Sequence, residues 1–188
     1  MIGLTEGVSQ YSEEPWLKFS YLGKVEFIAK KHYRIKVSSH ALYSAGAMLG
    51  RRSIKINGKV YKVRLMKGKN EGSQDDSSSY RGSIVMRSEW NRLMYPIYET
   101  QYFYNNQYKY NVSETDPPEH WGVNYKNDDL NLWRSTLCQD TGYYYRGSDE
   151  RIDAGIYVRG GSNCIDESYY REEDGPYFNW RPVLELIN

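Results

Sequence analysis

The sequence has few cysteines and no long apolar run. Its 188 residues include only Cys138 and Cys164, which stand far apart and form no C-x-x-C pair. This spacing argues against a metal cage or a disulfide framework, although one bridge between the two cysteines stays open. No apolar run approaches the ~20 residues that a membrane-spanning helix needs. The first residues also lack the charged-then-apolar pattern of a signal peptide, so neither membrane insertion nor Sec-type export is expected.

The chain also lacks an excess of charge of either sign. Its 25 lysines and arginines oppose 24 aspartates and glutamates, which gives a formal net charge of +1. Both signs are interspersed, and no basic stripe of the kind that phosphate contacts require is present. The charge pattern therefore argues against nucleic acid as a partner.

Tyrosine, in contrast, is abundant, with 20 residues against only 4 phenylalanines. Tyrosine supplies stiff contact area at low entropy cost, and the frequent Ser, Gly and Asn supply adaptable hydrogen bonds, a mixture typical of binding surfaces. The alternative is that many tyrosines hold a loop-rich fold together, with the ring buried and the hydroxyl outside. The length favours a single domain over residues 1–188 with its own core.

Alternating apolar residues predict β-strands at both ends of the chain. Two β-rich runs within residues 16–30 flank Leu22-Gly23 and predict a hairpin, and residues 31–37 predict a further strand. The strongest local signal is Asn57-Gly58 between alternating runs, because this pair accepts the positive φ angles of a type I′ turn. Residues 183–187 are apolar at four of five positions, which predicts a buried closing strand.

Apolar spacing predicts two helices. Ser38-Ser39 is suited to capping a first helix that ends at Gly50, with Leu42, Ala45 and Leu49 three and four residues apart. A second helix is predicted over residues 82–95. Its apolar face holds Met86, Trp90, Leu93 and Met94, and Pro96 prevents its continuation.

The polar stretches between these elements predict surface loops. Residues 67–79 are rich in Ser, Asp and Gly, and residues 101–129 are rich in Tyr and Asn. Within residues 130–141, three apolar side chains are expected to anchor the segment to the core: Leu132, Trp133 and Leu137.

Three short motifs resemble the C-type-lectin-like fold: Ser88-Glu89-Trp90, Arg159-Gly160-Gly161-Ser162 and Trp180-Arg181-Pro182-Val183. The likeness is to the branch shared by formylglycine-generating enzymes and the variable receptor-binding proteins that diversity-generating retroelements mutate. It implies an α+β fold of mixed antiparallel sheets with two helices and long irregular loops. Residues 16–19, 23–24, 58–65 and 88–95 also resemble uncharacterised phage and prophage proteins of Gram-positive bacteria.

The chain departs from this family where the enzymes hold their metal. Formylglycine-generating enzymes need two cysteines shortly after the Gly-Gly-Ser turn to hold copper, whereas here Cys164 follows the turn and Cys138 precedes it. The Glu-Pro-Asn or Gln-Pro-Asp triplet of calcium-dependent lectins is absent from the sequence as well. We therefore expect no metal, no cofactor and no enzymatic activity.

Two tyrosine-rich segments are predicted to bind the ligand. Three consecutive tyrosines precede Arg146 and would form a stacking and hydrogen-bonding surface, unless alternate rings face the core. Tyr169 and Tyr170 lie in a predicted loop without an apolar pattern, which indicates contact with a ligand or with another subunit. The predicted ligand-binding residues are Tyr143, Tyr144, Tyr145, Arg146, Asn163, Asp166, Tyr169, Tyr170, Arg171 and Tyr177.

No catalytic constellation stands out in the sequence. The second loop carries five carboxylates, but paired carboxylates hydrolyse glycosides only when rigid walls hold them about 5 or 6.5–9.5 Å apart. The three histidines, His32, His40 and His120, stand in no recognisable nucleophile context. Trp180-Arg181 is assigned a structural role, in which Trp180 fills the core and Arg181 clamps a loop carbonyl or carboxylate.

These observations predict a recognition protein, most simply a receptor-binding protein of a phage or prophage tail. The expected ligand is a bacterial surface glycan or protein, and the expected location is the virion or the bacterial surface. One shallow site binds weakly, so avidity from a homotrimer is expected. Two alternatives stay open: an oxidase or hydrolase on the same fold, and a purely structural tail or surface subunit whose tyrosines form interfaces.

Overall fold

The chain is predominantly β in the computed structural model, which describes residues 2–68, 88–98, 125–134, 136–139, 144–146, 152–154, 156–160, 164, 167–170 and 178–187. The strands are β1 (Val8–Ser9), β2 (Trp16–Tyr21), β3 (Lys24–Ala29), β4 (Arg34–Val37), β5 (Leu49–Ile56), β6 (Lys59–Arg64), β7 (Thr136–Cys138), β8 (Tyr144–Arg146), β9 (Ile152–Ala154), β10 (Ile156–Arg159), β11 (Glu167–Tyr170), β12 (Phe178–Trp180) and β13 (Val183–Ile187). The helices are α1 (Ser39–Ser44), α3 (Glu89–Leu93), α5 (Asn127–Leu130) and the 3-10 helix η1 (Tyr95–Ile97). Within these ranges, no helix has the length and apolar content to cross a bilayer.

A five-stranded antiparallel sheet contains the longest strands, in the order β2-β3-β13-β6-β5. Its two hairpins turn at Leu22-Gly23 and at Asn57-Gly58, and the last strand, β13, pairs with β3 on one side and β6 on the other. Asn57 and Gly58 both have positive φ, 49° and 81°, as the predicted type I′ turn requires. Both predicted hairpins and the predicted closing strand are confirmed.

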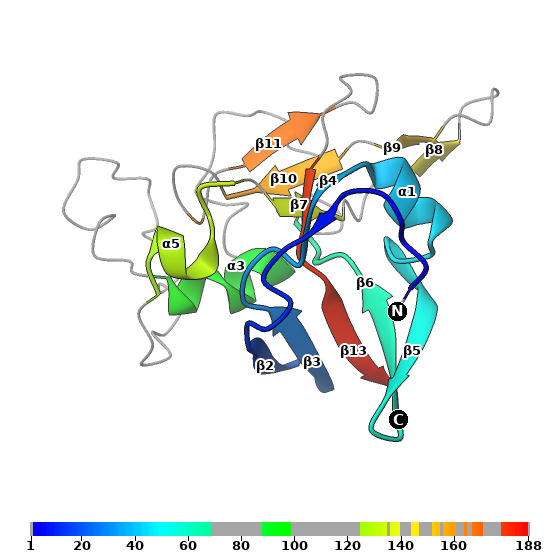
Figure 1. Ribbon diagram of the computed structural model, residues 1–188. Coiled ribbons are helices and arrows are strands. Elements are labelled where there is room, and N and C mark those ends of the chain that lie inside the picture. The colour runs from blue at the N-terminus through cyan, green and yellow to red at the C-terminus, as the bar shows by residue number, and fades with distance from the viewer. Residues whose placement is uncertain are drawn as a thin grey trace.

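A second sheet has six strands in the order β1-β4-β12-β7-β10-β11. All its pairs are antiparallel except β12 with β7, which run parallel and share the pair Asn179 and Thr136. Strands β8 and β9 form a separate two-stranded sheet. Figure 1 shows β7, β10 and β11 above the five-stranded sheet, with α3 and α5 to one side and α1 to the other. The expectation of mixed, mainly antiparallel sheets combined with helices is confirmed, although the described chain is mostly β and its helices are short.

The first helix is shorter than predicted. The Oγ of Ser38 accepts a hydrogen bond from the Ala41 amide (3.1 Å), which confirms the cap, but α1 ends at Ser44. Leu49 and Gly50 belong to β5, so the predicted end at Gly50 is wrong. Gly46 at φ +70° stops the helix and turns the chain into the strand, because a left-handed residue cannot continue a right-handed helix.

The second predicted helix is present as α3 followed by η1, which contains Pro96. Trp90, Leu93 and Met94 are fully or almost fully buried, which confirms the predicted apolar face; residues 82–87 lie outside the described ranges. The predicted anchor segment is confirmed for Leu132 and Leu137. Trp133 is 50% exposed and lies against the Arg134 guanidinium, so its assignment to the core is wrong.

Two predicted loops also contain ordered structure. Residues 127–130 form α5, although residues 101–129 were expected to be a loop. At the start of the 67–79 loop, Gly68 is buried and Lys67 forms an isolated parallel β-bridge with Gln139. Residues 69–79 lie outside the described ranges.

The five-stranded sheet has an apolar core against each of its two faces. Side chains alternate between the faces along a strand. Phe27, Leu184 and Val63 face the first core, to which β12 and α1 also contribute. Ile28 and Val183 face the second core, which is completed by α3, η1 and α5. We call these the first face and the second face of the sheet.

Candidate functional site

A groove crosses the first face of the five-stranded sheet. Its floor follows one row of directly opposed residues, Phe27 on β3, Leu184 on β13, Val63 on β6 and Arg52 on β5. Opposed residues of an antiparallel pair project to the same side, so this row forms a continuous surface. The groove has a volume of about 770 Å³, in the usual range for small-molecule sites.

One wall of the groove is aromatic. The Trp16 and Tyr33 rings lie 6.1 Å apart, and Tyr33 meets Trp180 edge to face at 6.0 Å. Phe27 and Tyr61 form a second edge-to-face pair on the floor at 5.9 Å. Such contacts hold each ring in place, so the wall is formed before any ligand arrives.

The polar groups of the groove are unevenly distributed. Trp180 is 3% exposed, and its indole Nε1–H has no acceptor within the described ranges. Arg52 and Lys55 are exposed lining residues on β5. No acidic, amide or imidazole side chain is among the described lining residues. The groove thus offers hydrogen-bond donors and positive charge together with an apolar floor.

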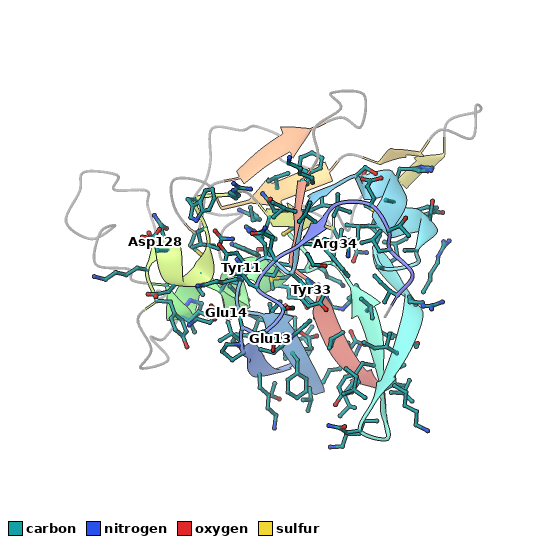
Figure 2. The ribbon with its side chains drawn as sticks, in the orientation of Figure 1. Tyr11, Glu13, Glu14, Tyr33, Arg34 and Asp128 are labelled. Carbon is teal, nitrogen blue, oxygen red and sulfur yellow. The ribbon has the colours of Figure 1, made fainter. Side chains whose placement is uncertain are left out.

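Tyr33 lies where the aromatic wall meets two opposite charges. Burial raises the pKa of its phenol, Arg34 opposes that shift, and Glu13 adds to it. Figure 2 shows Tyr33 beside Arg34 and close to Glu13 of the N-terminal segment. Tyr33 therefore stays protonated at neutral pH and keeps its hydroxyl as a neutral donor and acceptor.

The N-terminal segment borders the groove and is firmly tied down. Ile2 and Ser12 are lining residues. Arg34 donates to the carbonyls of Glu6 (2.5 Å) and Gly7 (3.2 Å), and the Glu6 carboxylate accepts from the amide and hydroxyl of Ser38. These bonds fix the segment against β4, which stabilises the border of the groove.

Two buried arginines hold the scaffold behind the groove. Arg181 donates to the carbonyls of Ala29, Lys30 and Leu130, which confirms its predicted role as a clamp, and Trp180 fills the core as predicted. Arg159, the first residue of the Arg-Gly-Gly-Ser motif, donates to the Gly68 carbonyl (3.0 Å). Both guanidinium groups bind backbone oxygens of segments distant in sequence.

His32 is fully buried in a hydrogen-bonded network. Asn131 donates from Nδ2 to His32 Nδ1 (3.0 Å), and His32 Nε2 lies 2.6 Å from Thr136 Oγ1. Because Nδ1 accepts, the ring is neutral with its proton on Nε2. Burial lowers the pKa of His32 well below 6.5, with further lowering by Arg181 and Arg134. The network joins β7 and α5 to the N-terminal half of the chain.

A buried ion cluster occupies the second face of the sheet. Arg64 binds Glu89 through two bonds (2.5 and 2.8 Å), Glu26 (2.7 Å) and Glu185 (3.1 Å), while Lys24 binds Glu185 from the surface (2.7 Å). Three carboxylates face two cations, and Glu26 Oε2 receives no donor in the described residues. Burial raises the pKa of Glu26 to about 7, aided by the neighbouring Glu89. A proton on Glu26 therefore balances the cluster.

Both cysteines are buried and unpaired, so the bridge that the sequence left open is absent. Burial raises the pKa of Cys138 to about 12, which keeps this thiol protonated at neutral pH. Across the described ranges, no group of three or more His, Cys, Asp or Glu is placed to hold a metal ion.

The predicted ligand-binding residues fall in two described strands and several undescribed positions. Tyr144, Tyr145 and Arg146 form β8, and Tyr169 and Tyr170 end β11, an edge strand of the six-stranded sheet. The loop predicted for Tyr169 and Tyr170 is therefore wrong, because both residues pair with β10. The residues outside the described ranges are Tyr143, Asn163, Asp166, Arg171 and Tyr177.

Sequence reasoning did not find the groove itself. Its aromatic wall comes from three distant strands or turns, and no local pattern links Trp16, Tyr33 and Trp180. The available signal was the abundance of tyrosine, which indicates binding surfaces without locating them. Comparisons with protein-family models, with curated proteins and with solved structures find no match.

Proposed function

We propose that this chain is a non-enzymatic recognition protein that binds its ligand in the aromatic groove of the five-stranded sheet. The observation that carries the proposal is the groove itself, a preformed hollow of about 770 Å³ with aromatic walls and few polar groups. Pockets with this composition are typical of binding sites. The wall is rigid before binding, which lowers the entropy lost when a ligand is ordered there.

The broader role rests on the resemblance of the sequence motifs. A C-type-lectin-like domain of a phage or prophage tail would use such a site to bind a molecule on the bacterial surface. Several copies in a homotrimer would convert weak single-site binding into stable attachment. The protein would then act at the virion or at the bacterial surface.

Cell binding by matched tryptophan variants tests the proposal. Trp16 lines the groove, whereas Trp133 is exposed next to α5 and is not a lining residue. Fluorescently labelled protein is titrated onto Gram-positive cells, with circular dichroism as the check on folding. We expect Trp16→Ala to weaken binding at least about tenfold, the usual effect of losing a central aromatic anchor, and Trp133→Ala to leave it unchanged.

The tyrosine-rich edge strand provides the competing site. If Tyr169→Ala/Tyr170→Ala abolishes cell binding while Trp16→Ala binds like the parent, the edge strand is the recognition surface and the groove is not.

A further inference from the structure

We infer that the groove takes an amphipathic anion, an apolar chain or ring system with a carboxylate or phosphate at the end that meets Arg52. The inference rests on the proposed function, since it names the ligand group for the same groove. It follows from three observations: the position of Arg52, the apolar floor and the unpartnered indole of Trp180.

Arg52 is the cation at the β5 end of the apolar row on the first face. It lies opposite Val63, and Ile54 lies opposite Tyr61, so Arg52 and Ile54 share the first face. Lys55 is also a lining residue, but it alternates with Ile54 and Ile56 along β5 and so does not belong to the row that contains Arg52. Arg52 is exposed and forms no ion pair in the described chain, so its guanidinium is available to an incoming anion.

The charge of the lining favours an anion over a cation. Among the described lining residues there is no carboxylate to bind a cationic group. The nearby acidic residue, Glu13, follows Ser12 and acts on Tyr33, at the aromatic wall beside β2 and β4. Arg52 lies on β5, at the opposite edge of the sheet. An anion bound by Arg52 is therefore separated from Glu13 by the width of the sheet.

The apolar floor determines the length and the apolar character of the main part of the ligand. Between Arg52 and Phe27 the row crosses β6 and β13, which corresponds to three strand spacings or about 14 Å. Val63, Leu184 and Phe27 offer only carbon atoms along this path. A medium-length aliphatic chain or a planar ring system matches both the length and the chemistry of this floor.

The Trp180 indole completes the polar contacts at the buried end. Its Nε1–H has no acceptor in the described residues although the side chain is 97% buried, given its exposure of 3%. Nε1 itself is covered in the free protein, so an oxygen of the ligand would satisfy the donor after a small shift of the ring exposes it. A neutral sugar fits less well, because the described lining holds no carboxylate or amide, and its side-chain acceptors are limited to the hydroxyls of Ser12, Tyr33, Ser53 and Tyr61.

Four probes with the same apolar chain test the charge requirement: decanoate, decyl phosphate, decanol and decyltrimethylammonium. Binding to the full chain is measured by calorimetry below the micellar concentrations, and the indole N–H signal of Trp180 is followed by NMR. We expect both anions to bind at least about tenfold more tightly than decanol at low salt, as a charge-assisted contact provides. We expect the ammonium probe to bind most weakly and the Trp180 signal to shift.

A charge-matched pair of variants locates the contact. Arg52→Gln should reduce the affinity for decanoate to that for decanol and leave decanol binding unchanged. Lys62→Gln removes a positive charge from the neighbouring strand β6, at an exposed position that alternates with Tyr61 and Val63 and is not a lining residue. This variant should retain the preference for anions. A preference that survives in Arg52→Gln, or equal binding of decanoate and decanol, overturns the inference.

The outcome separates this inference from the proposed function. If the parent binds cells and Trp16→Ala does not, but no anionic probe is preferred, the groove is the recognition site and its ligand is not an amphipathic anion. If Trp16→Ala binds cells like the parent, the proposed function is wrong, and the inference falls with it.

Discussion

At the scale of single residues, the buried charges of the second face are the most unusual feature. Glu26 is 1% exposed, and its carboxylate shares Arg64 with Glu89 and Glu185. Burying an ionised carboxylate without full pairing is unfavourable, so the group takes up a proton instead. Sequence alone gave no sign of this cluster, because its members come from β3, β6, α3 and β13. Neither the spacing of the four residues nor their type distinguishes them from surface charges.

The raised pKa of Glu26 predicts that stability decreases as the pH rises. The folded carboxyl has a pKa of about 7 against an ordinary value of 4.5, so folding takes up a proton between these values. The contribution of the Glu26 carboxyl to the free energy of unfolding is complete below pH 4.5 and is lost as the pH rises through about 7. Glu26→Gln, whose amide can still donate to Glu89, should remove this loss, as measured by urea unfolding between pH 5 and 8.

Glu185→Gln serves as the control with the opposite sign. Hydrogen bonds from Lys24 and the charge of Arg64 outweigh burial and lower the pKa of Glu185, so its contribution is present above pH 4.5 and is lost as the pH falls through the lowered pKa. This variant should be less stable than the parent throughout the range from pH 5 to 8. Parallel stability curves for Glu26→Gln and the parent would show that Glu26 does not take up the proton.

His32 should remain neutral where an exposed histidine titrates. Its Nδ1 accepts from Asn131, and a second ring proton would face that donor. Its pKa lies well below 6.5, so its contribution to stability is present above pH 6.5 and is lost as the pH falls below it. In an NMR titration from pH 8 to 5, the His32 ring signals should stay constant. His32 ring signals that move with a midpoint near 6.5 would contradict this arrangement.

At the scale of elements, short-range patterns predicted the strands well and the helix ends poorly. Alternating residues and Asn57-Gly58 gave both hairpins, because the two-residue period and the turn chemistry act over a few positions. The end of α1 depended on Gly46 and on the bulge that starts β5, which no apolar spacing reports. The strand β11 was missed because its pairing with β10, rather than an apolar pattern, places it in the sheet.

Two glycines with the same φ should respond very differently to alanine. Gly7 and Gly58 both have φ of 81°, so each alanine meets the same left-handed strain, about 1–2 kcal/mol. A Cβ at Gly58 meets nothing within 4 Å, whereas at Gly7 it would overlap the Ile35 carbonyl and the Val37 side chain. Gly7→Ala should therefore lower the free energy of unfolding by a further 1–3 kcal/mol or so, a typical effect of overpacking. Equal losses in urea unfolding would mean that the N-terminal segment does not pack on β4.

At the scale of the whole molecule, the five-stranded sheet separates two apolar cores with different surroundings. The first face opens into the aromatic groove, and the second face is closed by α3 over the ion cluster. The groove on one side is thus held rigid by packing on the other, which suits the binding role proposed for it. Sequence motifs pointed to Trp180 and Arg181 as scaffold, but the groove depends on how three distant segments meet.

Deleting residues 183–187 should abolish the fold rather than weaken it. Strand β13 pairs with β3 and β6, and its side chains enter both cores. Without it, two separate hairpins remain, and an isolated hairpin is marginal in water. We expect no cooperative thermal transition for this variant, whereas Ile187→Ala, at a 37% exposed position of the same strand, should retain one. A cooperative transition in the deletion variant would show that the rest of the chain folds without β13.

The central place of β13 also determines the order of events during synthesis. Arg64 and Glu185 are 121 positions apart, so the ribosome must add most of the chain before the two hairpins can be joined. Until then β3 and β6 each expose an unpaired edge, the kind of surface that other chains can pair with. Long-range pairing of this kind is slow to form. The nascent chain therefore passes through a long interval in which its two hairpins stay unjoined with exposed edges, and β13 ends that interval.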